Sequence, residues 1–476
     1  MRRYRRTTLI TVFCLAILAG LGAARKIDFI PGFALVWFLP LVIFLKSRRT
    51  VALFLVIAAG LGIGLWRGGA YMSHVRDLRS LTEQKVTITA TATSDSIYGK
   101  KSQIQFTGNN IQMIEPYQKS LAGSFKLSGF GEQMIYRGDR VEVTGKLFPS
   151  RGSNQATIAY AQLTRSSSGH SWYSDLSRRF GAGMQNALPE PTASFAMGLL
   201  VGQRTNLPVD ITAALTAVGL VHIVAVSGYN LTIIVRAVSR LKLGSKYQKL
   251  IISLALIAGF VMVTGFSASI VRAALVSVLS LWAWYYGRRV KPMVLISLAA
   301  AVTSLWNPFY IWGDLGWYLS FLAFSGVLVI APLITARLFE KPPKLLTSVL
   351  VETLAAELMT LPLILMTFSQ LSIIALVANL LVVPLVPLAM LLSAIAGVAG
   401  MLGPQIAGWV ALPARLLLTY MLDIVHMLSS IPSVLIHRAI SLTYMLVLYA
   451  LVLMLILINR HKAPKNKELA QQNFIN

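Results

Sequence analysis

The sequence predicts a polytopic α-helical membrane protein with a small all-β domain inserted near its N-terminus. Of 476 residues, 56% are hydrophobic, and the mean hydropathy is +0.68. A soluble protein of this length could not hide so much apolar surface. The apolar residues lie in runs long enough to cross a bilayer, and one polar, alternating segment from 81 to 165 interrupts them. About twelve spans are expected, some of them broken or re-entrant.

Residues 1–80 are expected to hold three transmembrane helices. The apolar runs Thr7–Ala24, Phe29–Leu45 and Thr50–Trp66 each suit a hydrocarbon core of about 30 Å. Arg25 and Lys26 follow the first run in place of a small-residue cleavage site, so it is interpreted as a retained span. Basic clusters before the first run and between the second and third place the N-terminus in the cytoplasm. Three crossings then put the next segment outside.

Residues 81–165 are expected to form an extracytoplasmic OB-like barrel. Five short segments alternate with period two, and turn signals such as Gly108-Asn109-Asn110 separate them. The predicted strands are Lys85–Thr93, Ser102–Phe106, Gly123–Leu127, Asp139–Leu147 and Ala156–Leu163.

Barrels of this type often bind single strands through a basic groove with aromatic platforms. The candidate DNA contacts are Lys100, Lys101, Phe106, Lys126 and Arg137, with Phe130, Tyr136 and Tyr160 nearby in sequence. A solvated spacer whose Lys and Arg serve solubility would show the same composition, and the sequence does not decide between the two.

Residues 166–190 are expected to be a linker followed by an amphipathic helix. Apolar side chains recur every fourth position from Trp172 to Leu188, with Arg178 and Arg179 off the stripe. An interfacial helix fits this pattern. Packing against neighbouring spans would give the same spacing.

Residues 191–460 are expected to form the main membrane domain, followed by a basic cytoplasmic tail over 461–476. No Asp, Glu, Lys or Arg occurs from Leu358 to Ala414, and Pro and Gly punctuate that stretch. Basic clusters separate the other runs, and all can be cytoplasmic if about nine crossings follow the barrel. The remaining runs are Ile211–Val235, Leu250–Val271, Ala273–Gly287, Pro292–Gly313, Leu315–Ala336 and Ala439–Asn459.

The stretch from Leu220 to Ile234 is the centre of the functional hypothesis. It is apolar, yet it contains His222, Ser227, Gly228, Tyr229 and Asn230. Polar groups in hydrocarbon are costly unless they are paired or face water. Ser-Gly also weakens a helix. The stretch is therefore interpreted as a broken helix lining a cavity, although an ordinary span with a packed Gly would also fit.

Ionisable residues inside the predicted spans are further candidates for the pathway. Arg236, Arg272, Asp314 and Glu357 all interrupt apolar runs, and intramembrane charges are functional hypotheses by default. Arg272 is expected to pair with Asp314 or with Glu357. A paired charge that only fixes helix register is the alternative.

Several enzymatic classes find little support. Ser227 and His222 are five residues apart, which points them away from each other on a continuous helix, and no G-x-S-x-G elbow is present. The six histidines form no metal-binding cluster, a phosphate loop is absent, and the single cysteine excludes an intramolecular disulfide. We expect no catalytic residue, metal or cofactor in this chain.

The motifs taken together resemble the ComEC-type competence proteins. The resemblance rests on Ala196–Pro208, Ala214–Ile234, Gly265–Arg288, Asn307–Val327 and Glu352–Leu391, in that order. Asn379, inside the last of these, joins the candidate pore residues. Gln203-Arg204 stands where the family has an acidic residue and Arg, and Tyr229-Asn230 stands where it has Leu-His. Many members continue into a metallo-β-lactamase-like domain, and this sequence stops at Asn476 without one.

The resemblance implies an inner-membrane channel that takes up single-stranded DNA during natural transformation. Backbone amides near Ser227–Asn230, with Arg236 and Arg272, would accept phosphate oxygens. Membrane lipids and a separate DNA receptor, cytoplasmic motor and nuclease are the implied partners, and a homo-oligomer is left open. A small-solute or lipid transporter on the same scaffold is the main alternative. An intramembrane hydrolase is the third.

Overall fold

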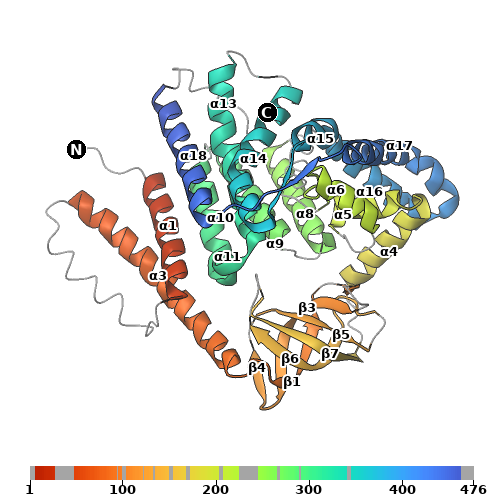
Figure 1. The fold of residues 1–476 in the computed structure, drawn as a ribbon, viewed down its shortest axis with the longest axis horizontal. Coiled ribbons are helices and arrows are strands. Elements are labelled where there is room, and N and C mark those ends of the chain that lie inside the picture. Colours follow the sequence, from red (N-terminus) through yellow and green to blue (C-terminus); the bar gives the residue numbers. More distant parts are fainter. Residues whose placement is uncertain are drawn as a thin grey trace. The chain divides into compact units, whose positions relative to one another are not determined.

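The computed structural model falls into two compact units, which are described separately. The first comprises residues 1–175 and 289–318, and the second comprises residues 176–288 and 319–476. Figure 1 labels the elements along the chain. The structure describes residues 6–26, 48–93, 95–98, 103–121, 123–131, 134–149, 154–167, 172–202, 207–224, 245–264, 268–288, 291–339, 343 and 345–462.

Six helices among the described residues are long and apolar enough to cross a membrane. They are Arg6–Ala24, Val51–Ser73, Leu315–Leu338, Thr347–Phe368, Ala375–Leu402 and Gln405–Ser429. Shorter apolar helices cover Thr192–Val201, Ser269–Tyr285, Pro292–Trp306 and Leu442–Ile458. A helical membrane protein is thus confirmed, while the count of twelve spans stays a prediction. The predicted second span, Phe29–Leu45, lies outside the described residues.

A seam of small residues joins the first two described helices of the first unit. Helix α1 (Arg6–Ala24) packs on α3 (Arg48–Arg79). A Cβ added at Gly64 would lie 2.3 Å from the carbonyl oxygen of Ile17, and one at Gly20 would lie 2.4 Å from that of Leu61. Glycine is needed at these positions because the two backbones approach so closely. Helices α10 (Pro292–Trp306) and α11 (Phe309–Gly313) complete this part of the unit.

The inserted domain of the first unit is a seven-stranded sheet, which confirms an all-β insertion. Its order is β1-β6-β7-β5-β3-β2, β4 pairs with β3, and β1 also pairs with β3. The β5–β7 pair is parallel. Closure of this sheet into a barrel stays a prediction. The strands are β1 (Lys85–Ala92), β2 (Ile97–Tyr98), β3 (Ile104–Glu115), β4 (Lys119–Leu121), β5 (Phe125–Phe130), β6 (Arg140–Pro149) and β7 (Ala156–Ser167).

The predicted turn at Gly108-Asn109-Asn110 is wrong, because β3 runs through it. Asn110 has φ +50°, and the β1–β3 register shifts between Thr89 and Thr91, which face Gln112 and Asn109. The segment is therefore a bulge inside a long strand. Residues with access to positive φ serve turns and bulges alike, so the local sequence did not distinguish them.

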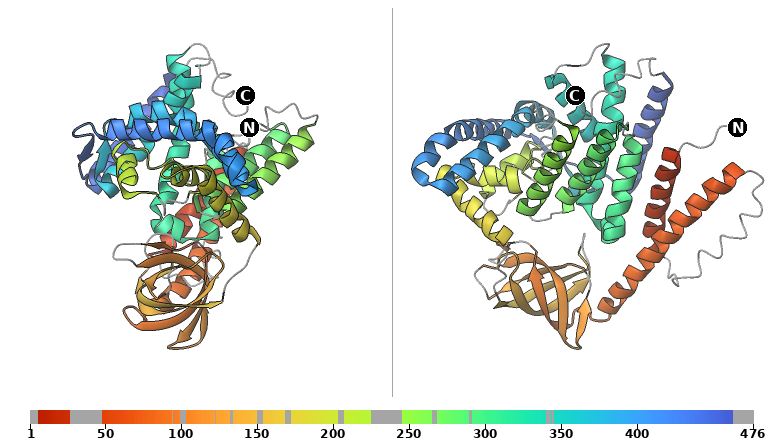
Figure 2. Two further views of the ribbon diagram at one scale, coloured as in Figure 1. Left: turned by 90° about the vertical axis from the view of Figure 1, so that its right-hand side faces the viewer. Right: turned by 180° about the vertical axis from the view of Figure 1, so that it is seen from behind.

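The second unit is helical. Helices α16 and α17 lie side by side, as do α8 and α9 (Figure 2). The elements are α4 (Trp172–Ala187), α5 (Thr192–Val201), α6 (Val209–Ala217), α8 (Lys246–Thr264), α9 (Ala268–Tyr285), α12 (Leu315–Ser325), the π-helical turn η3 (Gly326–Ile330), α13 (Ala331–Leu338), α14 (Leu345–Phe368), β8 (Gln370–Ser372), α15 (Ala375–Val382), the 3₁₀ turn η4 (Val383–Leu385), α16 (Val386–Leu402), α17 (Pro404–Ser429), β9 (Leu435–His437) and α18 (Leu442–Lys462).

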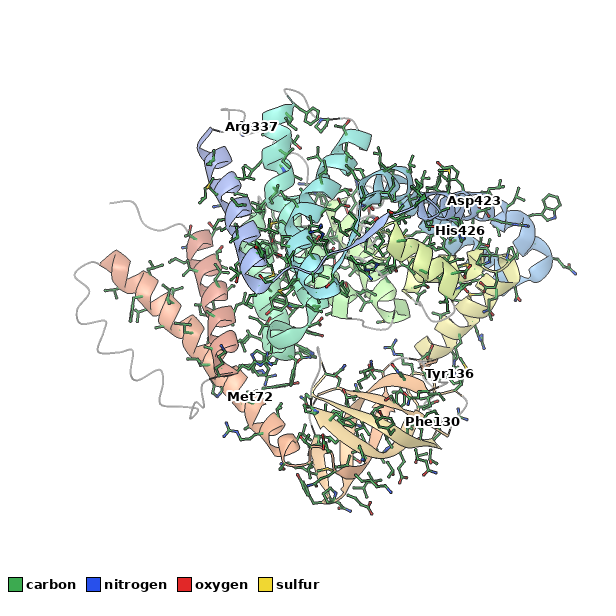
Figure 3. All side chains as sticks on the ribbon, viewed as in Figure 1. Met72, Phe130, Tyr136, Arg337, Asp423 and His426 are labelled. Atoms are coloured by element: carbon green, nitrogen blue, oxygen red, sulfur yellow. The ribbon has the colours of Figure 1, made fainter. Side chains whose placement is uncertain are left out.

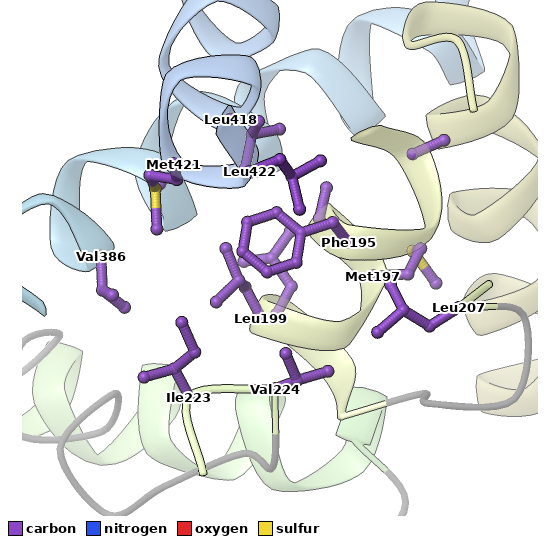
Figure 4. Close-up of a cluster of buried hydrophobic side chains, with 14 of the residues drawn as sticks. Phe195, Met197, Leu199, Leu207, Ile223, Val224, Val386, Leu418, Met421 and Leu422 are labelled. Atoms are coloured by element: carbon purple, nitrogen blue, oxygen red, sulfur yellow. The ribbon is translucent and has the colours of Figure 1, made fainter. Parts of the chain in front are cut away.

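The core of the second unit gathers around α5. Phe195 is fully buried and lies among Leu199, Leu418 and Leu422 (Figure 4). Helices α4 and α16 also cross closely, since a Cβ added at Gly400 would lie 1.8 Å from the carbonyl oxygen of Gly183. Two residues of the amphipathic stripe meet the same helix, since a Cβ added at Gly397 would lie 2.6 Å from the Phe180 ring and 3.1 Å from Cε of Met184. This half of the stripe therefore packs against a neighbouring helix, which was the second of its two interpretations.

Candidate functional site

The apolar run Ile211–Val235 contains the stretch that was interpreted as a broken helix. Within it, α6 stops at Ala217, just before that stretch begins at Leu220. Gly219 has φ +77°. The amide of Leu220 donates to the carbonyl of Leu215 at 2.8 Å, and that of Gly219 donates to Thr216 at 3.1 Å. This pair of bonds is the Schellman arrangement that ends helices at a left-handed glycine.

The segment after α6 is a series of turns from Val218 to Val224. Leu220 and Val224 are buried in the core of the second unit. His222 is exposed, with its Nδ1 3.0 Å from the carbonyl oxygen of Gly219. The described start of the central stretch is thus non-helical, with a polar ring turned away from the core. The other candidates there, Ser227, Gly228, Tyr229, Asn230 and Arg236, lie outside the described residues.

An extended connection lies beside these turns, between α14 and α15, which belong to two separate candidate spans. Ser369 has φ +55°, and β8 pairs with β9, which connects α17 to α18. The amide of Ile373 donates to the carbonyl of Val434 at 3.0 Å, and that of Arg438 donates to Ser369 at 2.9 Å. The two extended segments therefore satisfy each other's backbone groups.

The turns after α6 and this extended connection are in direct contact. A Cβ added at Gly219 would lie 2.8 Å from the Cβ of Ala375, the first residue of α15, and 3.5 Å from the Cβ of Ser372 in β8. The end of α6 and the connection between α14 and α15, which are far apart in sequence, therefore meet at one place in the second unit. We call the turns 218–224, β8 and α15 together the break site.

Two predicted candidates meet at the side of the break site. Asn379 on α15 donates through Nδ2 to Oε1 of Glu357 on α14 at 2.7 Å. The side chain of Asn379 is only 3% exposed, and its Oδ1 has no hydrogen-bond partner among the described residues. Glu357 is half-buried, and this donor offsets part of the hydration that its carboxyl group loses. This bond holds α15 against α14.

The remaining charged candidates are not brought together by the described contacts. Arg272 on α9 is buried, 4% exposed. Asp314 belongs to the first unit, where its Oδ1 accepts the amide of Trp317 at 3.2 Å at the start of α12. That contact gives Asp314 the structural role of a helix cap. The predicted pairing of Arg272 with Asp314 or Glu357 stays a prediction.

The candidate DNA contacts on the sheet divide into accessible and inaccessible groups. Phe106 is 4% exposed and belongs to the sheet core, so its prediction as a stacking platform is wrong. It shares the inner face with Ile104 two residues earlier, as strand alternation requires. Lys126 is exposed and Arg137 is half-buried. Lys100 and Lys101 lie outside the described residues. Figure 3 marks Phe130 and Tyr136 on this domain.

The sequence interpretation missed a polar and aromatic cluster of the first unit. Gln155, 3% exposed, donates through Nε2 to the Tyr71 hydroxyl at 2.6 Å, and Trp312 donates to the carbonyl of Leu21 at 2.8 Å. A cavity of about 210 Å³ lies beside them. Its signals in the sequence were weak, since a single Tyr and Trp in spans usually mark the membrane interface. The lining includes Arg25, Met72, Val75, Leu78, Phe309 and Gly313.

The fold defines a class: a helical membrane protein with an inserted sheet domain. The family model for the competence protein matches residues 199–462, more than half of the chain. The chain belongs to this family, and its resemblance to the ComEC-type members is confirmed.

The comparison with curated proteins gives one named relative. The chain is 31% identical over 201 residues to ComE operon protein 3 of Bacillus subtilis (strain 168). That match covers 41% of this chain and 25% of the relative. No solved structure matches the chain.

Proposed function

We propose that this protein forms a path for single-stranded DNA across the bacterial cytoplasmic membrane during natural transformation. Membership of the competence protein family supports the process, and the break site supports the mechanism. Each nucleotide carries a charged phosphate, which cannot enter hydrocarbon. A strand therefore needs a water-filled route lined by polar groups. Helix ends and turns, such as those of the break site, can expose backbone N–H and C=O groups to such a route.

The contact between Gly219 and Ala375 is the observation that carries this proposal. It joins the start of the central stretch to the first residue of α15. The N-terminal end of a helix carries partial positive charge, which favours a passing phosphate. The exposed ring of His222 belongs to the same turns. Together with Arg272, these groups would bind phosphate oxygens weakly enough to release them.

The sheet domain is proposed to receive the strand outside the cell. With the N-terminus cytoplasmic and an odd number of crossings before the sheet, this domain is extracytoplasmic. We further propose that the sheet closes into an OB-like barrel. In support, β1 pairs with β6 on one side and with β3 on the other, and β6, β7, β5 and β3 pair in succession.

The chain is proposed to act without catalysis of its own. A separate DNA receptor, a cytoplasmic motor and a nuclease would supply capture, energy and degradation of the second strand. The C-terminal tail would be cytoplasmic. A small-solute or lipid transporter is the second candidate, because the part-buried Glu357–Asn379 pair beside the break site also suits an ion-coupled carrier.

The test is uptake of fluorescent DNA by a strain lacking the gene. We expect the deletion to bind DNA at the surface but to accumulate no DNase-protected label, and the intact gene to restore uptake. Arg272→Glu is expected to abolish uptake with normal membrane levels, while Arg272→Lys retains a part of it. If the deletion strain takes up DNA as well as the wild type but loses transport of a solute or lipid, the protein is a transporter of the second kind and not a DNA channel.

A further inference from the structure

Tyr160 on β7 has an unusual conformation for an aromatic residue. Its φ is +54°, in the left-handed region that a bulky side chain rarely adopts. The side chain is 71% exposed, so no packing in the sheet core accounts for the strain. Strain of this kind persists only where the surrounding structure enforces it, and it concentrates at binding sites.

The strands on both sides of β7 enforce this conformation. On β6, Thr144 faces Gln162 and Lys146 faces Ala159, so Gly145 alone is opposite two residues of β7. On β5, Leu127 faces Ile158 and Gly129 faces Ala161, so the register shifts at the same place. Tyr160 is therefore the extra residue of a bulge against both neighbours.

Two glycines make room for this bulge. A Cβ added at Gly129 would lie 2.0 Å from the carbonyl oxygen of Ala161, and one at Gly145 would lie 2.8 Å from the Cβ of Ala161. Larger residues at either position would push β7 back toward a regular ladder. The sheet is thus built with small residues on three adjacent strands so that one tyrosine ring stands outward.

The surroundings of the ring are basic and aromatic. Lys146, opposite Ala159, and Lys126, opposite Thr157, are both exposed. Phe130 is 47% exposed and lies opposite Gln162. Gln162 comes two residues after Tyr160, so Phe130 lies about 7 Å further along the strand than Tyr160, at about 3.3 Å per residue. Two exposed rings with flanking ammonium groups are the combination with which proteins hold single strands.

We propose that Tyr160 is a base-stacking platform on a single-stranded DNA face made by β5, β6 and β7, and that the bulge presets its ring. This inference rests on the proposed function for the nature of the ligand. The ring stacks on a base while Lys126 and Lys146 neutralise the adjacent phosphates. Because stacking needs only a π-face, binding on this surface is independent of base identity.

The experiment measures binding of fluorescent oligonucleotides to the purified full-length protein in detergent, by anisotropy. The probes are oligo-dT and an abasic strand of equal length. Tyr160→Asn removes the ring but keeps a residue that tolerates positive φ, so its melting temperature should equal or exceed that of the wild type. Tyr160→Phe keeps the ring. Tyr117→Asn is the matched control, since Tyr117 is a second exposed tyrosine, 42% exposed, outside the bulge.

We expect Tyr160→Asn to weaken oligo-dT binding about tenfold, and Tyr160→Phe and Tyr117→Asn to leave it within about twofold. On the abasic strand, wild type and Tyr160→Asn should bind alike. Equal oligo-dT affinity for wild type and Tyr160→Asn would overturn the inference, as would an equal loss on both probes or no binding by the wild type. Failure of the proposed function appears separately, as unchanged DNA uptake in the deletion strain.

Discussion

The substitution Gly219→Ala probes the break site at its closest contact. Two costs add. Alanine at φ +77° costs about 1–2 kcal/mol, and its Cβ would lie 2.8 Å from the Cβ of Ala375, which adds about 1 kcal/mol of overpacking. We expect a total destabilisation of about 2–3 kcal/mol, because neither the turn nor the start of α15 can move without disturbing the buried residues around it.

Thermal unfolding of the detergent-purified protein measures this cost. The melting temperature should fall by a few degrees, on the order of 2–6 °C, and DNA uptake should fall with it. The matched control is Gly259→Ala on α8, where an added Cβ meets nothing within 4 Å. That change should be neutral or slightly stabilising, by up to about 1 kcal/mol.

A double-mutant cycle with Ala375→Gly separates the two costs. Ala375→Gly removes the Cβ against which the new Cβ of Gly219→Ala would pack too closely. The double variant should therefore recover the overpacking cost, which appears as a coupling energy of about 1 kcal/mol, and should keep the cost of alanine at positive φ. If Gly219→Ala melts like the wild type, or if the cycle shows no coupling, the turn does not pack on α15 as described and the reasoning fails.

Three further substitutions test other parts of the account. Asn379→Leu removes the hydrogen-bond donor of the half-buried Glu357 carboxylate and should destabilise by about 1.5–3 kcal/mol, whereas Glu357→Gln keeps a partner for Asn379 and should cost under about 1.5 kcal/mol; equal melting of the two variants would contradict this. Gly64→Leu should separate α1 from α3, since its Cβ would lie 2.3 Å from the Ile17 carbonyl, and a loss of folded protein in fluorescence-detected chromatography checks it. Phe106→Ala should destabilise the sheet by about 3–5 kcal/mol, and a stable variant with weaker DNA binding would restore Phe106 as a contact.

The alternating pattern of the inserted domain was enough to predict five of its seven strands, whereas the short strands β2 and β4 and the full length of β3 were missed. Val86, Ile88 and Ala90 occupy alternate positions of β1, and all are buried. The same alternation places Phe106 beside Ile104 on the inner face, so its burial could have been foreseen. The bulge at Tyr160 could not, because it depends on Gly129 and Gly145 of neighbouring strands, and strand partners are not visible in a single sequence.

The membrane part was predictable in kind but not in its interruptions. Apolar runs identify spans because the bilayer imposes length and composition. The end of α6 at Gly219 was present as a Gly-Leu signal, yet the apolar residues that follow hid it within a longer run. The bond between Glu357 and Asn379 joins residues 22 positions apart on separate helices, and only the packing of α14 on α15 brings them together.

Cysteine accessibility tests the central claim, a wet break site used by the strand, most directly. The chain has one native cysteine, Cys14, which is buried, so Cys14→Ala gives a clean background. In the Cys14→Ala protein, the variant His222→Cys is treated with a membrane-impermeant maleimide. Leu220→Cys, at a buried position of the same turns, is the control. The account predicts that His222→Cys reacts and that added single-stranded DNA slows the reaction, while Leu220→Cys stays unlabelled. An unreactive His222→Cys, or labelling that is indifferent to DNA, would contradict it.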